Sequence, residues 1–306
     1  MPSPQVVRRK RLEILRKKIR FERLLFSEFR KWQRKVYDAF IEQKRTGSSI
    51  VVIPSLLRKE LSEILVSHYY RVAEAFVPGL AMGEIKSSYS GQPLDGDNPE
   101  QESSYTDFLL PAVLLSIRNS MKDQIALTLP YRVKNILSTN EKAGNESTVI
   151  VNRNPDITYD NVLAGKLASK TKTVSITETT WVAESVMASS VHHTTPILPL
   201  AGPDELKDLQ KISPSVTLGE IDVDEFFSIS LAERLIILRS LMTPKKTWVS
   251  MHDNRVRDTH IQADGQTVPV DEPFTLGGGL LMYPTDQSLG VSFSEVVNCR
   301  CWAMYF

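Results

Sequence analysis

The chain has 306 residues, of which 42% are hydrophobic and 24% charged, and it contains two cysteines. This length and composition allow a buried core in one or two domains and exclude a fully disordered chain. The apolar runs are too short for a membrane span, and no apolar segment follows the basic N-terminus, so we expect no secretory signal. The two cysteines, Cys299 and Cys301, are separated by a single residue and cannot form a disulfide framework, which indicates a reducing compartment.

The charge is distributed very unevenly along the chain. The formal net charge is +1, but residues 1–45 hold 15 Lys and Arg residues against 5 acidic ones, and the remainder holds 22 basic and 31 acidic residues. The N-terminal end therefore carries a net charge of +10 and the rest −9. Such asymmetry indicates a polyanionic partner for the basic end.

Residues 6–45 are predicted to form one long helix of roughly 50–60 Å. Apolar residues recur at steps of three and four and form a heptad-like stripe of Leu12, Leu15, Ile19, Phe26, Phe29, Val36 and Phe40. Glu22 and Gln33 occupy the two remaining positions of this stripe. Phe21, Leu25 and Trp32 lie beside it and widen it. Two interpretations remain open: an amphipathic helix packed on a core, or an arm that lies on nucleic acid or on a partner's helices. The basic residues expected to bind DNA without sequence preference are Arg8, Arg9, Lys10, Arg11, Arg16, Lys17, Lys18 and Arg20.

The middle of the chain is predicted to be mainly helical. A Gly/Ser break with an apolar strand or turn is expected at 46–53, then a helix that is capped by Ser55 and ends near Phe76. Further along we expect helices at 105–119, 120–138, 158–170, 174–190 and 223–241, a polar loop at 140–155 and a proline-rich irregular segment at 191–220. The predicted domains are a basic helical N-terminal region at 1–86, a linker at 87–104 and a domain at 105–306.

The last sixty-five residues have the pattern of a small antiparallel β unit. Strands are expected at 248–250, 267–270 and 280–283, with a final strand within 296–306. Asp264-Gly265-Gln266 predicts a hairpin turn, and Gly277-Gly278-Gly279 a flexible turn. Together with the helices, this predicts an α+β fold.

One cluster of residues in this unit could carry chemistry. His260, Cys299 and Cys301, completed by His252 or Asp253, are ligands suited to a structural zinc ion, the one cofactor that the sequence suggests. The period of a strand places both sulfur atoms on one face, which permits shared ligation or a packed pair. Alternatively, Asp253, Arg255, Arg257 and Arg300 form a buried salt-bridge network.

An enzymatic interpretation of the same cluster is weaker. His260, Asp253 and Arg257 could in principle serve a nuclease or transferase, but nothing in their spacing fixes a catalytic geometry. The sequence has no P-loop, Gly-x-Ser-x-Gly or His-Glu-x-x-His motif.

A set of motif residues extends through the C-terminal part of the sequence: Trp248, Asp253, Arg255, Arg257, His260, Asp264, Gly265, Asn298 and Arg300. This pattern resembles that of the phage Mu F-like (MuF) minor head proteins, the head morphogenesis family of tailed bacteriophages. The resemblance is strong over residues 245–306, and Ile176-Thr177-Glu178-Thr179 is similar, in loosened form, to a helix of that family.

The resemblance implies a structural, non-enzymatic minor capsid protein. Such a protein is made in the bacterial cytoplasm and lies inside the virion near the portal, where it acts in head morphogenesis and in genome packaging or ejection. The implied partners are the portal protein, double-stranded DNA, and a second copy or the scaffold and capsid proteins. The alternative is a phage-encoded nuclease or transferase that uses His260, Asp253 and Arg257.

Overall fold

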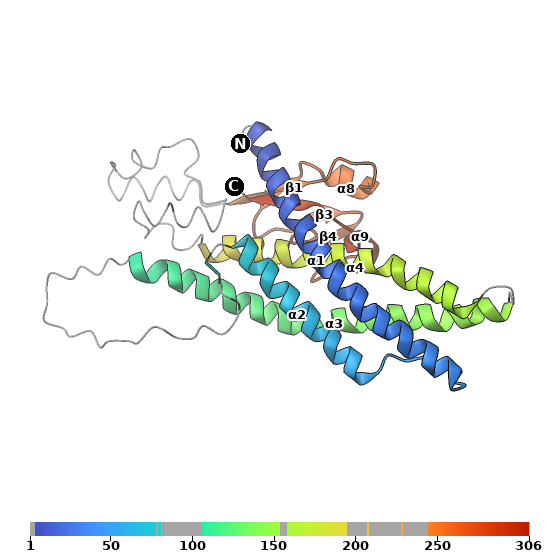
Figure 1. Ribbon diagram of the computed structural model, residues 1–306. Coiled ribbons are helices and arrows are strands. Elements are labelled where there is room, and N and C mark those ends of the chain that lie inside the picture. Colours follow the sequence, from blue (N-terminus) through green and yellow to red (C-terminus); the bar gives the residue numbers. More distant parts are fainter. Residues whose placement is uncertain are drawn as a thin grey trace, which may run out of the picture.

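Four long helices and a small C-terminal β unit make up the described fold (Figure 1). The computed structural model describes residues 4–77, 79–80, 82, 106–153, 158–194, 207, 228 and 244–305. The long helices are α1 (Pro4–Arg45), α2 (Ser55–Phe76), α3 (Thr106–Arg153) and α4 (Tyr159–Thr194). The C-terminal elements are β1 (Lys245–Val249), α8 (Asp258–Ala263), β2 (Thr267–Pro269), β3 (Phe274–Leu276), β4 (Gly279–Leu281), α9 (Phe293–Val296) and β5 (Trp302–Tyr305). The predicted α+β class is confirmed.

Helix α1 is continuous, as predicted, and is packed on a core. Its buried stripe runs at steps of four, four, three, four and four through Phe21, Leu25, Phe29, Trp32, Val36 and Phe40. Glu22 and Gln33 are buried beside this stripe. Two residues of the expected stripe face solvent instead, since Leu12 is 43% and Phe26 36% exposed. The core-packed interpretation therefore holds for the C-terminal two-thirds of this helix.

Helix α4 is the central element of the molecule. Every residue from 175 to 186 is buried, because α4 contacts α1, α2 and α3 along its length and β5 near its end (Figure 1). A helix covered on all sides needs no polar face and therefore gives no clear amphipathic pattern. For this reason the expected break between 170 and 174 is wrong, and one helix spans both predicted ones.

The expected boundary near 119 and the polar loop at 140–155 are wrong too, because α3 is one helix to Arg153. Its polar residues make tertiary contacts instead of a loop. The Asn140 side chain bonds Gln33 of α1, and Asn145 accepts a hydrogen bond from the backbone N–H of Val51 at 2.9 Å. Gly144 permits close approach, since a Cβ there would lie 2.7 Å from a ring carbon of Phe40.

The α1–α2 connection forms no strand. Val51 and Ile53 are buried, and side chains of α3 accept hydrogen bonds from their backbone N–H groups. The Glu141 carboxylate accepts the hydrogen bond from the Ile53 N–H at 2.9 Å. Helix α2 has the predicted extent, but Ser55 is its first residue and Pro54 is the N-cap.

The C-terminal unit contains a three-stranded antiparallel sheet in the order β2-β1-β5 and a separate β3–β4 hairpin. Trp248 of β1 is opposite Ala303 of β5. The β3–β4 turn uses Gly277 and Gly278, with φ of 54° and 83°, which glycine adopts readily. The expected hairpin at Asp264-Gly265 is wrong, because these residues end α8 and lead into β2.

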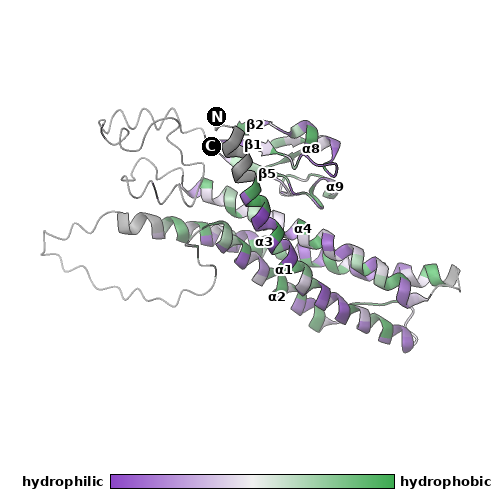
Figure 2. Ribbon diagram, turned by 45° about the horizontal axis from the view of Figure 1, so that its top comes forward, coloured by the Kyte–Doolittle hydropathy of each residue, from purple (hydrophilic) through white to green (hydrophobic). Residues whose placement is uncertain are grey.

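Two hydrophobic cores are joined by α4. The larger is shared by α1, α2, α3 and α4, so the basic N-terminal region packs in one core with the helices that follow it. The smaller lies in the C-terminal unit and includes Val191 of α4. Figure 2 shows hydrophobic and hydrophilic residues alternating along the long helices. The described helices include none with the length and apolar character needed to cross a membrane. The expected linker at 87–104 and nearly all of the expected 223–241 helix lie outside the described residues.

Candidate functional site

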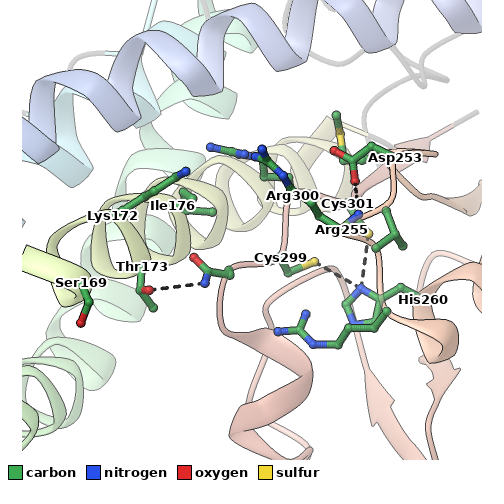
Figure 3. A pocket seen from close by; sticks show the side chains of 14 residues that line it. Ser169, Lys172, Thr173, Ile176, Asp253, Arg255, His260, Cys299, Arg300 and Cys301 are labelled. Atoms are coloured by element: carbon green, nitrogen blue, oxygen red, sulfur yellow. Dashed lines mark hydrogen bonds between the residues drawn. The ribbon is translucent and has the colours of Figure 1, made fainter. Parts of the chain in front are cut away.

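His260, Cys299 and Cys301 form a compact buried cluster, as the sequence predicts (Figure 3). Nδ1 of His260 lies 3.4 Å from Sγ of Cys301 and 3.6 Å from Sγ of Cys299. The three candidate ligand atoms lie within 4.8 Å of one another, and no other His, Cys, Asp or Glu among the described residues completes the group. Asp253, expected as a fourth ligand, is exposed and outside it.

The local fold explains why these side chains meet. Helix α8 presents His260 from one side, and the extended segment before β5 presents both sulfur atoms from the other. Side chains alternate along an extended chain, so the cysteines share a face while Arg300, between them, points to α1. Trp248 packs edge-on against the His260 ring at a centroid distance of 5.4 Å and limits its movement.

The environment favours one thiolate in the cysteine pair. A hydrogen bond with Cys301, supported by His260, lowers the pKa of the Cys299 thiol. The same pairing raises the pKa of the Cys301 thiol. Thiolates are the nucleophilic and metal-binding form of cysteine, and the two shifts make Cys299 the more readily ionised of the pair.

A cavity of about 380 Å³ borders this cluster. Its lining includes Asp253, Arg255 and Arg257 together with His260 and both cysteines (Figure 3). His260, Asp253 and Arg257, the residues of the enzymatic interpretation, therefore line the same cavity. Among the described interactions, none joins His260 to Asp253 or Arg257.

The expected buried salt-bridge network is wrong. Asp253 and Arg255 are exposed, and the Asp253 carboxylate accepts a hydrogen bond from the backbone N–H of Arg255 at 3.0 Å. Arg257 donates to the backbone carbonyl of Val297. Arg300 makes a two-pronged ion pair with Glu22 of α1, with N···O distances of 2.9 and 2.5 Å.

Two other motif residues have structural roles. One carboxylate oxygen of Asp264 accepts a hydrogen bond from the Ser250 backbone N–H at 2.6 Å. Its other oxygen lies 2.8 Å from Nε2 of His252. Asn298 adopts a φ of 58°, and its backbone N–H donates to Thr177 of α4 at 3.0 Å. Both contacts fix the loops that surround the cysteine–histidine cluster.

Comparison with known proteins identifies this part of the chain. Residues 239–304 match the family described as Phage Mu protein F like protein. This C-terminal part is similar to that family and is named the MuF-like domain. This match confirms the resemblance to the phage Mu F-like head morphogenesis proteins.

A second match covers a short stretch. Over 57 residues the chain is 46% identical to the NAD(+)--arginine ADP-ribosyltransferase EFV of Enterococcus faecalis (strain ATCC 700802 / V583). That stretch is 19% of this chain, and the chain spans 11% of the length of that relative. No solved structure matches the chain.

Helix α1 is fastened to the MuF-like domain by buried charges. Lys18 is 1% exposed, and its Nζ lies 2.5 Å from the Glu184 carboxylate of α4 and 3.2 Å from the Cys301 carbonyl. The second oxygen of Glu184 accepts from the Ala303 backbone N–H at 3.0 Å. Burial raises the pKa of Glu184, and Lys18 and this amide oppose the rise. The prediction of Lys18 as a DNA contact is therefore wrong, because its charge is used inside the protein.

A second buried polar group secures the helices beneath the domain. Glu178, from the segment that resembles a family helix, binds the Tyr69 hydroxyl at 2.5 Å and Arg132 at 2.9 Å. Next to it, Nε2 of His68 lies 2.9 Å from the Thr179 hydroxyl, and burial lowers the pKa of His68 to about 3. His68 is thus a fully buried residue of the bundle core.

Of the other expected DNA contacts, Arg16 and Arg20 are exposed and Lys17 is partly exposed. The side chains of Arg8, Arg9, Lys10 and Arg11 lie outside the described ones. Sequence reasoning missed three exposed arginines on the same face, Arg23, Arg30 and Arg34. From Arg20 onward these arginines follow one another at intervals of three, seven and four residues, which keep side chains on one side of a helix. This spacing could have identified them from the sequence.

Proposed function

We propose that this protein is a structural minor head protein of a tailed bacteriophage, located inside the virion. The family match over residues 239–304 is the observation that carries the proposal. In this role the protein associates with the portal and with DNA during head morphogenesis and genome packaging or ejection. The arrangement of α1 and the MuF-like domain supports a binding role in two ways.

The first support is a stripe of arginines along α1. Arg16, Arg20, Arg23, Arg30 and Arg34 are all exposed and are spaced by four, three, seven and four residues. At 100° per residue they lie on one side of the helix, opposite the buried stripe through Leu25 and Trp32. The stripe extends over about 27 Å, which matches about eight base pairs of DNA. A row of guanidinium groups at this spacing suits phosphates and reads no sequence.

The second support is the rigid connection of this stripe to the MuF-like domain. The buried pair of Lys18 and Glu184 and the pair of Glu22 and Arg300 fix α1 against the domain. A contact made by the domain with the portal would therefore orient the arginine stripe toward the genome. This coupling favours an interaction protein over a freely mobile basic arm.

The DNA part of the proposal is tested by a charge variant. Arg23→Gln, Arg30→Gln and Arg34→Gln in one chain should weaken binding to duplexes of any sequence and reduce the salt slope by about 0.9 per lost phosphate contact. The matched control removes the same number of charges with Lys59→Gln, Lys134→Gln and Lys142→Gln in one chain, since all three residues are exposed on α2 or α3 and not on the stripe. Equal losses in both variants would indicate that overall charge, and not the stripe, determines affinity.

The portal part is tested by co-sedimentation with assembled portal rings. The full chain should sediment with the rings, and the Arg→Gln stripe variant should do so equally well. If binding disappears with the arginines, the portal is held through charge on α1 and the proposed division of roles fails.

A second candidate function is enzymatic, most plainly a transferase. It is favoured by the short similarity to the ADP-ribosyltransferase of Enterococcus faecalis and by the cavity that Asp253, Arg257 and His260 line. A transferase activity of the purified chain that is lost in a folded Asp253→Asn variant would support this candidate. Asp253 is suitable because it is exposed and outside the buried cluster.

A further inference from the structure

The spacing of the cysteine–histidine cluster is that of a metal site. A tetrahedral zinc ion with Zn–S near 2.3 Å and Zn–N near 2.05 Å places nitrogen and sulfur ligands about 3.5 Å apart. The observed distances from Nδ1 of His260 are 3.4 Å to Cys301 and 3.6 Å to Cys299. Both nitrogen–sulfur distances therefore fit a zinc ion bound between these atoms.

The surroundings hold the ligands in place. All three residues are almost fully buried, with exposures of 1% for His260, 3% for Cys299 and 2% for Cys301. The ring of His260 lies against Trp248, which itself packs edge-on against Phe274. Rigid, preorganised side chains lose little freedom when an ion binds.

An independent observation comes from the other nitrogen of His260. Nε2 is buried and has no aligned hydrogen-bond partner, but it lies 3.2 Å from the Glu295 carboxylate. Thr259 donates to the same carboxylate at 2.8 Å and fixes it. Metal-binding histidines commonly offer their second nitrogen to a carboxylate, which sets the tautomer that leaves the first nitrogen free for the metal. Glu295 is in position to do so here.

We propose that His260, Cys299 and Cys301 bind one zinc ion, with a water molecule from the adjoining cavity in the fourth position. Two sulfurs and one imidazole select zinc over magnesium or calcium, which prefer oxygen. The cavity of about 380 Å³ borders all three ligands and leaves room for the water. The ion would tie α8 to the segment before β5, about 40 residues away, in a domain whose strands are short. This inference is independent of the proposed portal and DNA contacts.

The test uses the full chain purified under reducing conditions in zinc-supplemented medium. Elemental analysis should find about one zinc ion per chain, and X-ray absorption should show two sulfur and two nitrogen or oxygen neighbours. Replacement by cobalt should produce thiolate-to-cobalt charge-transfer absorption. Because the chain contains two cysteines in total, that absorption can arise from this site alone.

Variants complete the test. Cys299→Ser with Cys301→Ser should abolish the charge-transfer absorption, and His260→Asn should lower zinc affinity at least tenfold. His192→Asn with His193→Asn is the matched control for chance binding by two adjacent histidines, and it should retain the metal. Since cluster variants could fail to fold, the wild-type measurements decide the matter.

Three results would overturn the proposal. The first is a folded wild-type chain with two titratable thiols, no zinc and no charge-transfer absorption after addition of cobalt. The second is bound zinc surrounded by nitrogen and oxygen neighbours alone. The third is full metal binding by the folded double-cysteine variant.

Discussion

In the bundle of α1 to α4 the core is long and consists mainly of large apolar side chains, whereas the MuF-like domain has strands of three to five residues and a smaller core that includes Cys299 and Cys301. The bundle core is long and continuous, and its residues can exchange with others of similar size. The domain core is small, so its contacts with the bundle, such as those of Lys18 with the Cys301 carbonyl and of Glu184 with the Ala303 backbone N–H, contribute more of its stability.

The largest effect is expected in the bundle core. Trp32 is fully buried, stacks on Phe29 and donates to the Leu57 carbonyl at 2.7 Å. Trp32→Ala should lower the free energy of unfolding by about 3–5 kcal/mol, measured by chemical denaturation. Leu12→Ala, at an exposed position of the same helix, should change it by less than about 0.5 kcal/mol. Similar losses in both variants would contradict the packing of α1 described above.

The next effect tests the charged fastening of the domain. Lys18→Met leaves the Glu184 carboxylate buried without its cation and should cost about 3 kcal/mol. The double variant Lys18→Met with Glu184→Leu should recover much of this loss, because it removes both buried charges. Lys17→Met is the control on the partly exposed neighbouring position and should be nearly neutral. A Lys18→Met protein as stable as wild type would show that the domain does not depend on this pair.

A pH effect of intermediate size is expected from His68, a buried polar residue in the bundle core. The pKa of His68 is lowered to about 3 by burial, whereas the unfolded chain binds a proton there near pH 6.5. Between these values the unfolded state holds the extra proton, so stability falls as the pH falls. The loss between pH 7 and pH 5 should be about 2 kcal/mol. Urea titrations of His68→Gln should show this loss reduced; an unchanged pH dependence would argue against a buried neutral imidazole.

The smallest effect concerns the turn between β3 and β4. Gly278 has a φ of 83°, so Gly278→Ala should cost about 1–2 kcal/mol through backbone strain. Gly165→Ala is the matched control in α4, where a Cβ meets open space, and it should be neutral or stabilising by up to about 1 kcal/mol. Thermal unfolding of the two variants measures the difference. If Gly278→Ala is the more stable of the two, strain does not determine the turn.

The fold class, α1, the extent of α2 and the cysteine–histidine cluster could be predicted from sequence, because each depends on local periodicity or spacing. The continuity of α3 and α4 could not, since their buried polar residues, such as Asn140 and Thr171, are stabilised by contacts with Gln33 far away in the chain. The burial of Lys18 could not be predicted either, because the sequence around it resembles that of the neighbouring basic residues and its partner Glu184 is far away in the chain. Long-range pairing of charges leaves no periodic trace in a single sequence.

The central claim, a minor head role, is tested most directly by quantitative mass spectrometry of purified DNA-filled particles of the parent phage, scaled to the portal protein. We expect the chain in these particles at or below the abundance of the portal protein. Detection in the infected-cell lysate but not in the particles would contradict the virion role, and the cavity beside His260 would then be tested as an active site.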